Sequence, residues 1–352
     1  MTRPMKIVIA LDSFKECLPS ADANAAAARG VAAACPEAEV LCRGVSDGGE
    51  GWLDACRGAL GGEWVMAQVH DPLMRPIQAS YLVSGGVAIL ESARVCGLQL
   101  VAPSERDPLA ATTYGLGELV ADAWLRGYRQ LLVGLGGSAT SDAGRGMLRA
   151  LEERCPEVFV PGTPRLEVTL AADVSAPLCG PTGAALCYSP QKGASPQAAT
   201  ELERQARRFA ADSAARLGFD RSCEPGAGAA GGLGYAFLQF FGATLRSGAG
   251  LLLDMLGFDG LLSGADWVIT GEGASDAQTL MGKVPFRILE RARRQGVRTA
   301  LLAGRIADRE ALLQAGFDRV LCINPPGLPA ASALDPAVAS GNIQQTVQQL
   351  FI

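Results

Sequence analysis

Four segments of the sequence combine glycine or hydroxyl side chains with an acidic residue directly after a short apolar run. They are residues 11–15 (Leu-Asp-Ser-Phe-Lys), 136–142 (Gly-Gly-Ser-Ala-Thr-Ser-Asp), 172–173 (Ala-Asp) and 271–276 (Gly-Glu-Gly-Ala-Ser-Asp). Glycines let successive backbone N–H groups turn toward an anion, hydroxyls add donors, and carboxylates hold the Mg²⁺ that accompanies a nucleoside triphosphate. This combination is typical of phosphoryl transfer. One such loop alone indicates only a turn, whereas four together favour a functional site.

The elements that must carry these loops are short apolar runs separated by stretches with helical character. Eight runs are present, at residues 6–10, 39–42, 87–90, 131–135, 166–171, 267–270, 299–303 and 319–323. Their alternation with helices predicts an α/β fold with largely parallel sheets. Ligands of such sheets bind beyond the carboxyl ends of the strands, which is where the four loops fall.

Helix boundaries are marked at several points of the chain. Ser195-Pro196 predicts a helix start with proline at its first position, and Gly218 predicts the end of that helix. Ser20 is expected to cap a helix that Pro36 terminates. Residues 225–245 are uncharged and long enough to span a bilayer, but their first half is rich in glycine and alanine. We expect a buried glycine-rich loop there that leads into a core helix.

The composition is that of a folded protein that acts on small molecules. The chain has 352 residues, 49% of them hydrophobic and 19% charged, which predicts sizeable cores and two domains. A net charge of -5 argues against nucleic acid or an anionic membrane as partner. The ten cysteines form no CxxC pair, and one histidine allows no Cys/His zinc site. Reduced, mostly buried thiols and the lack of a recognisable export signal predict a cytoplasmic protein.

Two familiar nucleotide-binding signatures were tested against the sequence. No GxxxxGK[ST] motif occurs, because Gly282-Lys283 is followed by Val284, so the chain is not a P-loop enzyme. Residues 134–139 match the loose GxGxxA dinucleotide fingerprint, with acidic residues somewhat under 20 positions further on. A nicotinamide-dependent oxidoreductase is therefore the main alternative, although it gives the acid of residues 140–142 no role.

Two basic features and the single histidine lie outside the four segments. Lys192 precedes the helix expected from Ser195, where its ammonium could meet a phosphate, and an ordinary surface lysine is the equal alternative. His70 is expected to have a surface or turn role, since no second histidine accompanies it. The arginines within residues 287–294 have helical spacing and predict a solvated face.

Several motifs occur in the order found in one known family. They are Asp12-Ser13-Phe14-Lys15, Ser46-Asp47-Gly48-Gly49-Glu50-Gly51, Thr112-Thr113-Tyr114-Gly115, Gly136-Gly137-Ser138-Ala139-Thr140, Ala172-Asp173, Pro190-Gln191-Lys192-Gly193, the glycine-rich residues 226–232, and Ile269-Thr270-Gly271-Glu272-Gly273 followed by Gln278-Thr279 and Gly282-Lys283. With them the chain resembles the type I glycerate kinase family over nearly its full length.

The resemblance implies a fold, cofactors and a substrate. It implies a flavodoxin-like parallel-sheet domain formed by both chain ends, residues 1–62 and 265–352, with a second α/β domain, residues 63–264, inserted in it. It further implies ATP and Mg²⁺ as cofactors, D-glycerate as acceptor and phosphoglycerate as product, with the 2-phosphate favoured. The oligomeric state stays open, and a homodimer is among the states we consider.

The resemblance also suggests roles for individual residues. Mg²⁺ would be held by Asp142 or Asp173. Phosphates would be held by Gly136, Gly137, Ser138, Thr140 and Lys192. The acceptor hydroxyl would be oriented or deprotonated by an acid among Asp47, Glu272 and Asp276. Binding of the glycerate carboxylate or the transferred phosphate falls to Ser13, Lys15 and Lys283, and Gly48, Gly49 and Glu50 complete the predicted binding set.

The chain departs from the family pattern at three places. Ala274 stands where family members usually have an arginine, which puts the grip on the acceptor in question. Ser141 replaces the usual asparagine before Asp142, and residues 151–164 look shortened. Because of Ala274, a non-catalytic glycerate-binding protein derived from a kinase is the second alternative.

Overall fold

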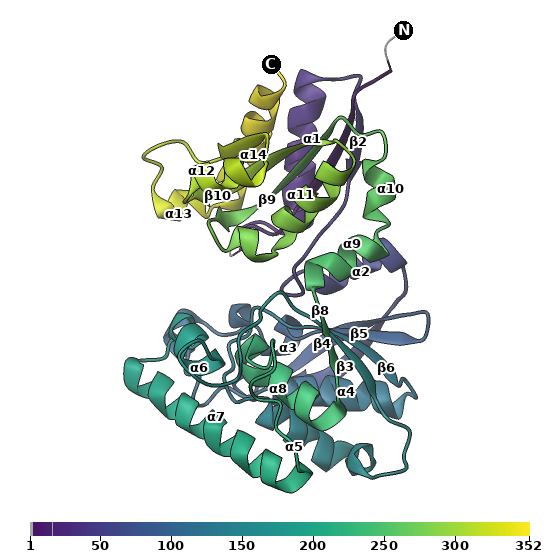
Figure 1. Cartoon of the computed structure of the whole chain (residues 1–352), viewed down its shortest axis with the longest axis vertical. Coiled ribbons are helices and arrows are strands. Elements are labelled where there is room, and N and C mark those ends of the chain that lie inside the picture. Colours follow the sequence, from purple (N-terminus) through teal and green to yellow (C-terminus); the bar gives the residue numbers. More distant parts are fainter. Residues whose placement is uncertain (1–2, 16) are drawn as a thin grey trace. The chain divides into compact units, whose positions relative to one another are not determined.

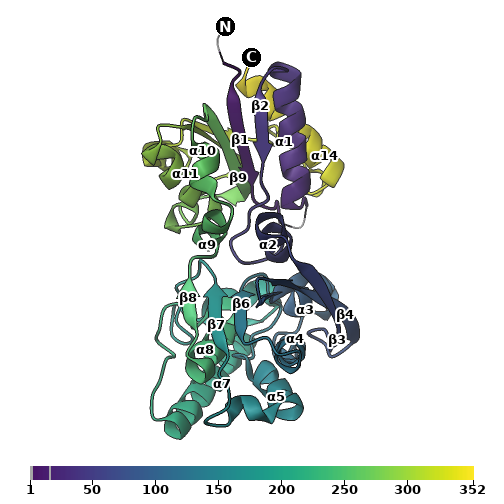
Figure 2. The same cartoon turned by 90° about the vertical axis from the view of Figure 1, so that its right-hand side faces the viewer.

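The structure is a computed structural model that describes residues 3–15 and 17–352. Its contacts divide the chain into two compact units, shown in Figures 1 and 2. Unit 1 comprises Met1–Asp47, Asp54–Leu60 and Ala249–Ile352, and unit 2 comprises Gly48–Leu53 and Gly61–Gly248. Both units are α/β structures, which confirms the predicted fold class.

Unit 1 is built on a parallel sheet of five strands in the order β11-β10-β9-β1-β2. The strands are β1 (Lys6–Leu11), β2 (Glu39–Cys42), β9 (Trp267–Ser275), β10 (Arg298–Ile306) and β11 (Arg319–Cys322). Counted within the unit, the order is 2-1-3-4-5, which is the flavodoxin-like arrangement. Its topological switch point lies between β1 and β9, where neighbouring connections leave on opposite sides of the sheet.

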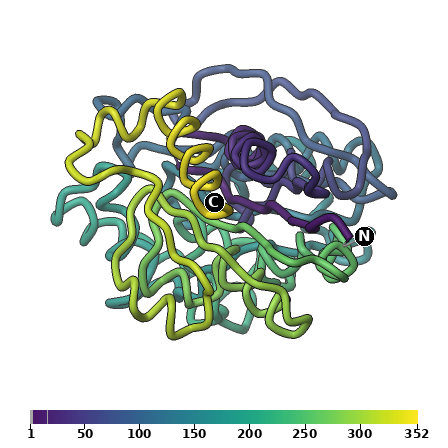
Figure 3. Tube along the Cα trace, turned by 90° about the horizontal axis from the view of Figure 1, so that it is seen from above, coloured from purple at the N-terminus to yellow at the C-terminus, as the bar shows by residue number. Residues whose placement is uncertain are grey.

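Helices cover both faces of this sheet. Its helices are α1 (Ser20–Ala34), α2 (Trp52–Leu60), α9 (Gly248–Met255), α10 (Phe258–Leu262), α11 (Val284–Arg294), α12 (Arg309–Ala315), α13 (Ala330–Ala333) and α14 (Pro336–Leu350). The alanine-rich α1 lies beside α14, as Figure 3 shows from above. Both helices pack against the alternate buried residues of β1. The close approach requires glycine at position 30, since a Cβ there would lie 2.9 Å from the Val347 side chain. Leu289 of α11 and Leu312 of α12 belong to a second, smaller core.

Unit 2 is built on a mixed sheet of six strands in the order β3-β4-β5-β6-β7-β8. The strands are β3 (Glu63–His70), β4 (Pro76–Ser84), β5 (Val87–Glu91), β6 (Gln130–Gly134), β7 (Glu167–Ala171) and β8 (Thr244–Arg246). The first three strands pair antiparallel, and β5 to β8 pair in parallel. The parallel part therefore has its carboxyl ends along one edge.

The helices of unit 2 enclose the larger core of the chain. They are α3 (Ala93–Cys96), α4 (Tyr114–Leu125), α5 (Arg145–Arg154), α6 (Ala184–Tyr188), α7 (Pro196–Leu217) and α8 (Ala229–Phe241), and short 3-10 turns occur at Leu98–Leu100, Pro103–Glu105, Pro156–Phe159, Pro190–Lys192 and, in unit 1, Thr279–Met281. The prediction for α7 is confirmed, since the Ser195 hydroxyl accepts a hydrogen bond from the Ala198 N–H and Gly218 ends the helix. The buried glycine-rich turn before α8 is also confirmed.

The predicted strands all form, and the structure adds three that the sequence reading missed. The hairpin β3–β4 and the short β8 are not among the eight predicted runs, because their outward residues interrupt the apolar pattern. Ser20 was wrongly assigned as an N-cap. It is the first residue of α1, and its hydroxyl donates to the Leu11 carbonyl instead.

Three further sequence expectations meet the structure as follows. Contacts group residues 249–264 with unit 1, whereas the sequence assigned them to the inserted domain. All ten cysteines are free thiols, but only Cys56, Cys96 and Cys155 are buried, so the expectation of mostly buried thiols was wrong. Within residues 3–15 and 17–352, none of the helices has the length and apolar character needed to cross a bilayer.

Candidate functional site

In unit 1, the predicted site residues gather at the carboxyl ends of β1 and β9. The two strands are paired in register from Ile7 with Trp267 to Leu11 with Gly271. Asp12 therefore follows β1 at the level where Glu272 stands on β9, on either side of the switch point. Such crevices are the usual ligand sites of open parallel sheets. We call Asp12, Ser13, Lys15, Asp47, Glu272 and Lys283 the acidic edge.

Asp12 is held in place by the strand that precedes it. Its N–H donates to the Gly271 carbonyl, and the Leu11 N–H donates to the Asn24 side chain. The residue is 7% exposed, and one oxygen of its carboxylate accepts a hydrogen bond from the Ser13 N–H at 2.7 Å. Burial, and next the negative charge of Asp47, raise the pKa of the Asp12 carboxyl well above its usual range.

Glu272 is surrounded by donors from the segment that follows it. Its carboxylate accepts hydrogen bonds from the Thr279 hydroxyl at 2.6 Å and the Ser275 hydroxyl at 3.2 Å. The Lys283 ammonium lies 3.4 Å from its other oxygen. Both oxygens of this buried acid thus have partners in the protein. Asp276 has a turn role, since its side chain accepts from the Gln278 N–H.

The remaining predicted residues of unit 1 line the same edge. The Lys15 ammonium lies 3.9 Å from an Asp47 oxygen, and its side chain is 67% exposed. An exposed pair of this kind adds little stability, so Lys15 can turn toward a ligand at small cost. Ser13 is buried beside Asp12. The acidic edge therefore combines three carboxylates with two lysines.

In unit 2, residues 48–51 form a loop that lies against the ends of β6 and β7. Glycine is required at 48, where φ is +103° and a Cβ would lie 2.3 Å from the Ala171 carbonyl oxygen. A Cβ at Gly136 would come within 2.7 Å of the Gly49 Cα. The buried Glu91, at the end of β5, accepts hydrogen bonds from the N–H groups of Gly51 and Leu53. Glu91 was missed by the sequence reading, because an acid at the end of an apolar run has many roles.

The loop after β6 carries the predicted phosphate-binding residues. Its backbone is pinned to the segment after β5, since the Leu98 N–H donates to the Gly137 carbonyl and the Ala139 N–H donates to the Cys96 carbonyl. Gly137 has a positive φ of +61°. The Thr140 hydroxyl is buried and lacks a hydrogen-bond partner among the described residues.

Lys192 is the last residue of the 3-10 turn Pro190–Lys192, and its side chain extends to this loop. Its side chain is buried, and its ammonium donates to the Thr140 carbonyl at 2.6 Å and to the Ser138 hydroxyl at 3.0 Å. No carboxylate of the described chain forms an ion pair with it. Burial lowers the pKa of Lys192 to about 8, and the charge of Asp142 partly opposes that shift. We call residues 136–140 with Lys192 the amide loop.

Gly231, in the kinked first turn of α8, lies against this ammonium. A Cβ at that position would lie 2.0 Å from the Thr140 carbonyl oxygen and 3.0 Å from Lys192 Nζ. Ala230, Gly231 and Gly232 all have positive φ, which accounts for the glycine-rich sequence there. The surface-lysine alternative for Lys192 was wrong.

Asp142 is fully occupied by donors of the protein. Its carboxylate accepts hydrogen bonds from the N–H groups of Thr113, Gly144 and Gly146 at 3.0 Å. The hydroxyls of Thr113 and Thr112 donate to it as well. A carboxylate offers about four lone-pair directions, so this conformation has no capacity left for a metal. Asp142 joins the Thr112–Thr113 turn to the start of α5.

The fit of a Mg²⁺ ion was tested on the donors present. Within the described part of the chain, no three Cys, His, Asp or Glu side chains lie close enough to hold an ion. Mg²⁺ usually needs only one or two carboxylates, with phosphate and water oxygens completing its shell. Asp173 is half-buried and lies two residues after β7, at the same end of the sheet as the loop after β6.

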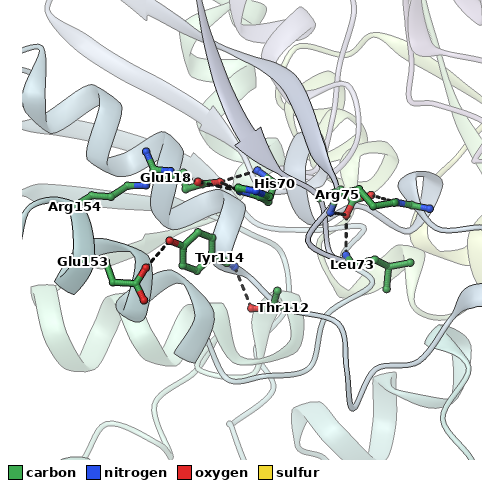
Figure 4. Close-up of polar contacts among 9 residues, drawn as sticks. His70, Leu73, Arg75, Thr112, Tyr114, Glu118, Glu153 and Arg154 are labelled. Carbon is green, nitrogen blue, oxygen red and sulfur yellow. Dashed lines mark hydrogen bonds and ion pairs between the residues drawn. The ribbon is translucent and has the colours of Figure 1, made fainter.

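Figure 4 shows how the single histidine and the neighbouring helices are connected. His70 ends β3, and its ring lies 3.1 Å from both oxygens of the buried Glu118. Arg154 donates to the same carboxylate. The Tyr114 hydroxyl donates to Glu153 at 2.5 Å. His70 is thus part of a network that joins β3, α4 and α5, not the turn or surface residue we expected.

The dinucleotide interpretation fails on the local geometry. In that motif the pyrophosphate lies on the N-terminus of a helix that opens within the glycine loop. Here β6 ends at Gly134 and α5 begins only at Arg145, because the intervening loop is anchored on Cys96 and Asp142.

Comparison with known proteins identifies the family. The profile of the glycerate kinase family matches residues 7–159 and 157–352. The chain belongs to the glycerate kinase family. It is 37% identical over 373 residues to a glycerate kinase of Halalkalibacterium halodurans, covering 98% of this chain and 97% of that protein. It is 36% identical over 358 residues to a glycerate 2-kinase of Escherichia coli, covering 95% of this chain and 93% of that protein.

A solved structure supports the same assignment. A crystal structure of a protein assigned as glycerate kinase 2 from Salmonella typhimurium LT2 matches with a TM-score of 0.77 and 34% identity. The match covers 99% of this chain and 97% of the other. The chain is therefore an enzyme, a kinase of this family. The oxidoreductase and non-catalytic alternatives are not favoured.

Proposed function

We propose that the chain transfers the γ-phosphoryl group of ATP to a hydroxyl of D-glycerate, with Mg²⁺, and that the product is 2-phosphoglycerate. The buried Lys192 ammonium carries this proposal, because it donates to one carbonyl and one hydroxyl and lacks a carboxylate partner in the described chain. A buried cation of this kind is stabilised when a phosphate arrives. The 2-phosphate is favoured because the Escherichia coli relative is a glycerate 2-kinase.

The residues of the chain act by positioning and by neutralising charge, which supply most of the catalysis in phosphoryl transfer. Lys192, with Gly136, Gly137, Ser138 and Thr140, would hold phosphate oxygens. Mg²⁺, held through Asp173 and phosphate oxygens, would withdraw charge from the transferred group when bound. Gly48, Gly49 and Glu50 belong to the same binding set.

The acidic edge would hold the acceptor. Lys283 and Lys15 are the cations there, and each already lies beside a carboxylate, at Glu272 and Asp47. The carboxylate of glycerate would form an ion pair with one of these lysines. The other lysine would orient the hydroxyl that receives the phosphoryl group. Ser13 adds a hydroxyl next to Asp12. We propose a cytoplasmic location, since ATP is the donor.

A steady-state assay tests the proposed reaction. ADP release should require D-glycerate and Mg²⁺ together, and L-glycerate should serve as the matched control acceptor. Phosphorus NMR of the product should show 2-phosphoglycerate, and light scattering should show whether the enzyme is a homodimer. ADP release that is independent of D-glycerate would disprove the acceptor, and a 3-phosphate product would disprove the position of transfer.

A further inference from the structure

The three acids predicted to act on the acceptor hydroxyl are occupied in different ways. Glu272 accepts hydrogen bonds from Thr279 and Ser275 and faces Lys283. Asp276 caps a turn through the Gln278 N–H. Asp47 is paired with Lys15, and its side chain is 25% exposed. None of the three combines deep burial with an oxygen left to accept a proton.

Asp12 combines these properties. Its side chain is buried, and the Ser13 N–H donates to one of its oxygens. Pairing of β1 with β9 fixes its backbone through the Gly271 carbonyl, and Ser20 and Asn24 hold the preceding residue. A rigid, desolvated carboxylate at the switch point is well suited to meet a small acceptor.

We propose that Asp12 is the general base that removes the proton from the acceptor hydroxyl. This inference rests on the proposed function and adds a residue to it. The hydroxyl proton moves to the Asp12 carboxylate, and the oxygen's electron pair forms the new bond to the γ-phosphorus. The bond between that phosphorus and the β,γ-bridging oxygen breaks, ADP leaves with the bond's electrons, and Asp12 returns the proton to solvent.

The electrostatic surroundings favour this role. Asp47 precedes α2, Glu272 stands on β9, and both negative charges raise the pKa of Asp12 beyond the effect of burial. Lys15 and the Ser13 N–H oppose the rise. Lys283 faces Glu272 from the start of α11. A base is most effective when its pKa lies near the working pH, which an ordinary exposed aspartate does not achieve.

The decisive variant is Asp12→Asn, because the asparagine oxygen can still accept from the Ser13 N–H. The matched control is Asp266→Asn. Asp266 lies at the opposite, amino end of the same sheet and likewise accepts a backbone N–H, that of Lys6. We expect Asp12→Asn to lower kcat by roughly 10²–10⁴-fold with KM values for ATP and glycerate within about threefold. The control should keep the kcat of the unmodified enzyme.

The pH profile and stability separate a base from a structural residue. In the unmodified enzyme, kcat should rise with pH as Asp12 ionises, and this limb should vanish in Asp12→Asn. The raised pKa means that ionisation of Asp12 destabilises the fold as pH rises from the unfolded to the folded pKa. The melting temperature of Asp12→Asn at pH 7 should therefore equal or exceed that of the unmodified enzyme. A purely structural carboxylate would give a lower one.

Three outcomes would overturn the inference. The first is an unchanged kcat in Asp12→Asn. The second is a kcat of the variant that saturating Mg²⁺ restores, which would make Asp12 a metal ligand. The third is a rise of kcat with pH that persists in the variant. Failure of the proposed function is distinguishable from these. In that case the unmodified enzyme itself shows no ADP release that depends on D-glycerate.

Discussion

The acidic edge of unit 1 and the amide loop of unit 2 present opposite chemistries at the same kind of place, the carboxyl ends of parallel strands. The acidic edge relies on side chains, namely Asp12, Asp47 and Glu272 with two lysines. The amide loop relies on backbone groups and one buried ammonium, Lys192. The sheet fixes where such groups meet, and the residue types decide whether a proton acceptor or an anion site results.

In both regions a buried charge lowers the stability of the fold. Each contains a buried ionisable group whose charged form is disfavoured, so that the pKa of Asp12 is raised and the pKa of Lys192 is lowered to about 8. Proteins retain such destabilised charges at sites where a bound ligand stabilises them. Removing either charge is therefore expected to lower activity and to raise stability.

The largest effect is expected from Lys192→Met. Loss of the ammonium should lower kcat/KM for ATP about 10³-fold, or about 4 kcal/mol, because the transferred charge loses its buried counterion. The methionine variant should unfold at a higher temperature at pH 7, since protonation of the unfolded lysine destabilises the fold as pH falls from its ordinary pKa to about 8. Lys6→Met, on a half-buried lysine of unit 1 that donates to the Ser263 carbonyl, is the control. An equal loss in the control would contradict the assignment.

In the unmodified enzyme, the charge of Lys192 should make the KM for ATP depend on pH. As pH rises through about 8, the Lys192 ammonium of the free enzyme loses its proton, so the KM for ATP should increase. Steady-state kinetics between about pH 6 and 9.5 would measure this limb. A KM for ATP that is flat above pH 8 in the unmodified enzyme would separate Lys192 from nucleotide binding.

A smaller effect is expected from Lys283→Met at the acidic edge. The variant should raise the KM for glycerate about 30-fold, or about 2 kcal/mol, because the acceptor carboxylate loses a cation. The KM for ATP should stay unchanged, which is the reverse of the pattern expected for Lys192. An increase in the KM for ATP instead would show that the two regions do not divide the substrates as proposed.

Asp142→Asn and Asp173→Asn test the metal assignment inside unit 2. Asp142→Asn should lower the free energy of unfolding by about 2 kcal/mol, because an amide group would face N–H donors. Its Mg²⁺ activation constant should not change. Asp173→Asn should raise that constant about tenfold. The opposite pattern would restore Asp142 as the metal ligand.

The smallest effect is expected at Arg305. It is exposed on β10 and is the register partner of Ala274 on β9, so it lies on the neighbouring strand, opposite the position that lacks an arginine. Arg305→Ala should raise the KM for glycerate about threefold, as expected for an exposed charge. Arg298→Ala, at the amino end of the same strand, is the matched control. An unchanged KM for glycerate in Arg305→Ala would show that Arg305 does not replace the arginine missing at position 274.

Much of the fold could be predicted from the sequence, for reasons that are local. Apolar runs such as residues 131–135 become strands because their side chains must be buried, and the Ser195-Pro196 start of α7 satisfies its own backbone groups. The hairpin β3–β4 was not predicted, because half of its residues face outward and vary in polarity. Its stability comes from neighbours that are distant in the sequence.

The roles within the site depended on contacts that no local pattern encodes. The sequence by itself determined the family, the strand-end loops and the residue types available for phosphate, metal and acceptor. Only the tertiary structure showed that donors from residues 112–113 and 144–146 saturate Asp142, while within residues 3–15 and 17–352 only the Ser13 N–H donates to the Asp12 carboxylate. The reason is physical, because hydrogen-bond saturation and desolvation depend on which distant groups fold against a carboxylate, not on its neighbours along the chain.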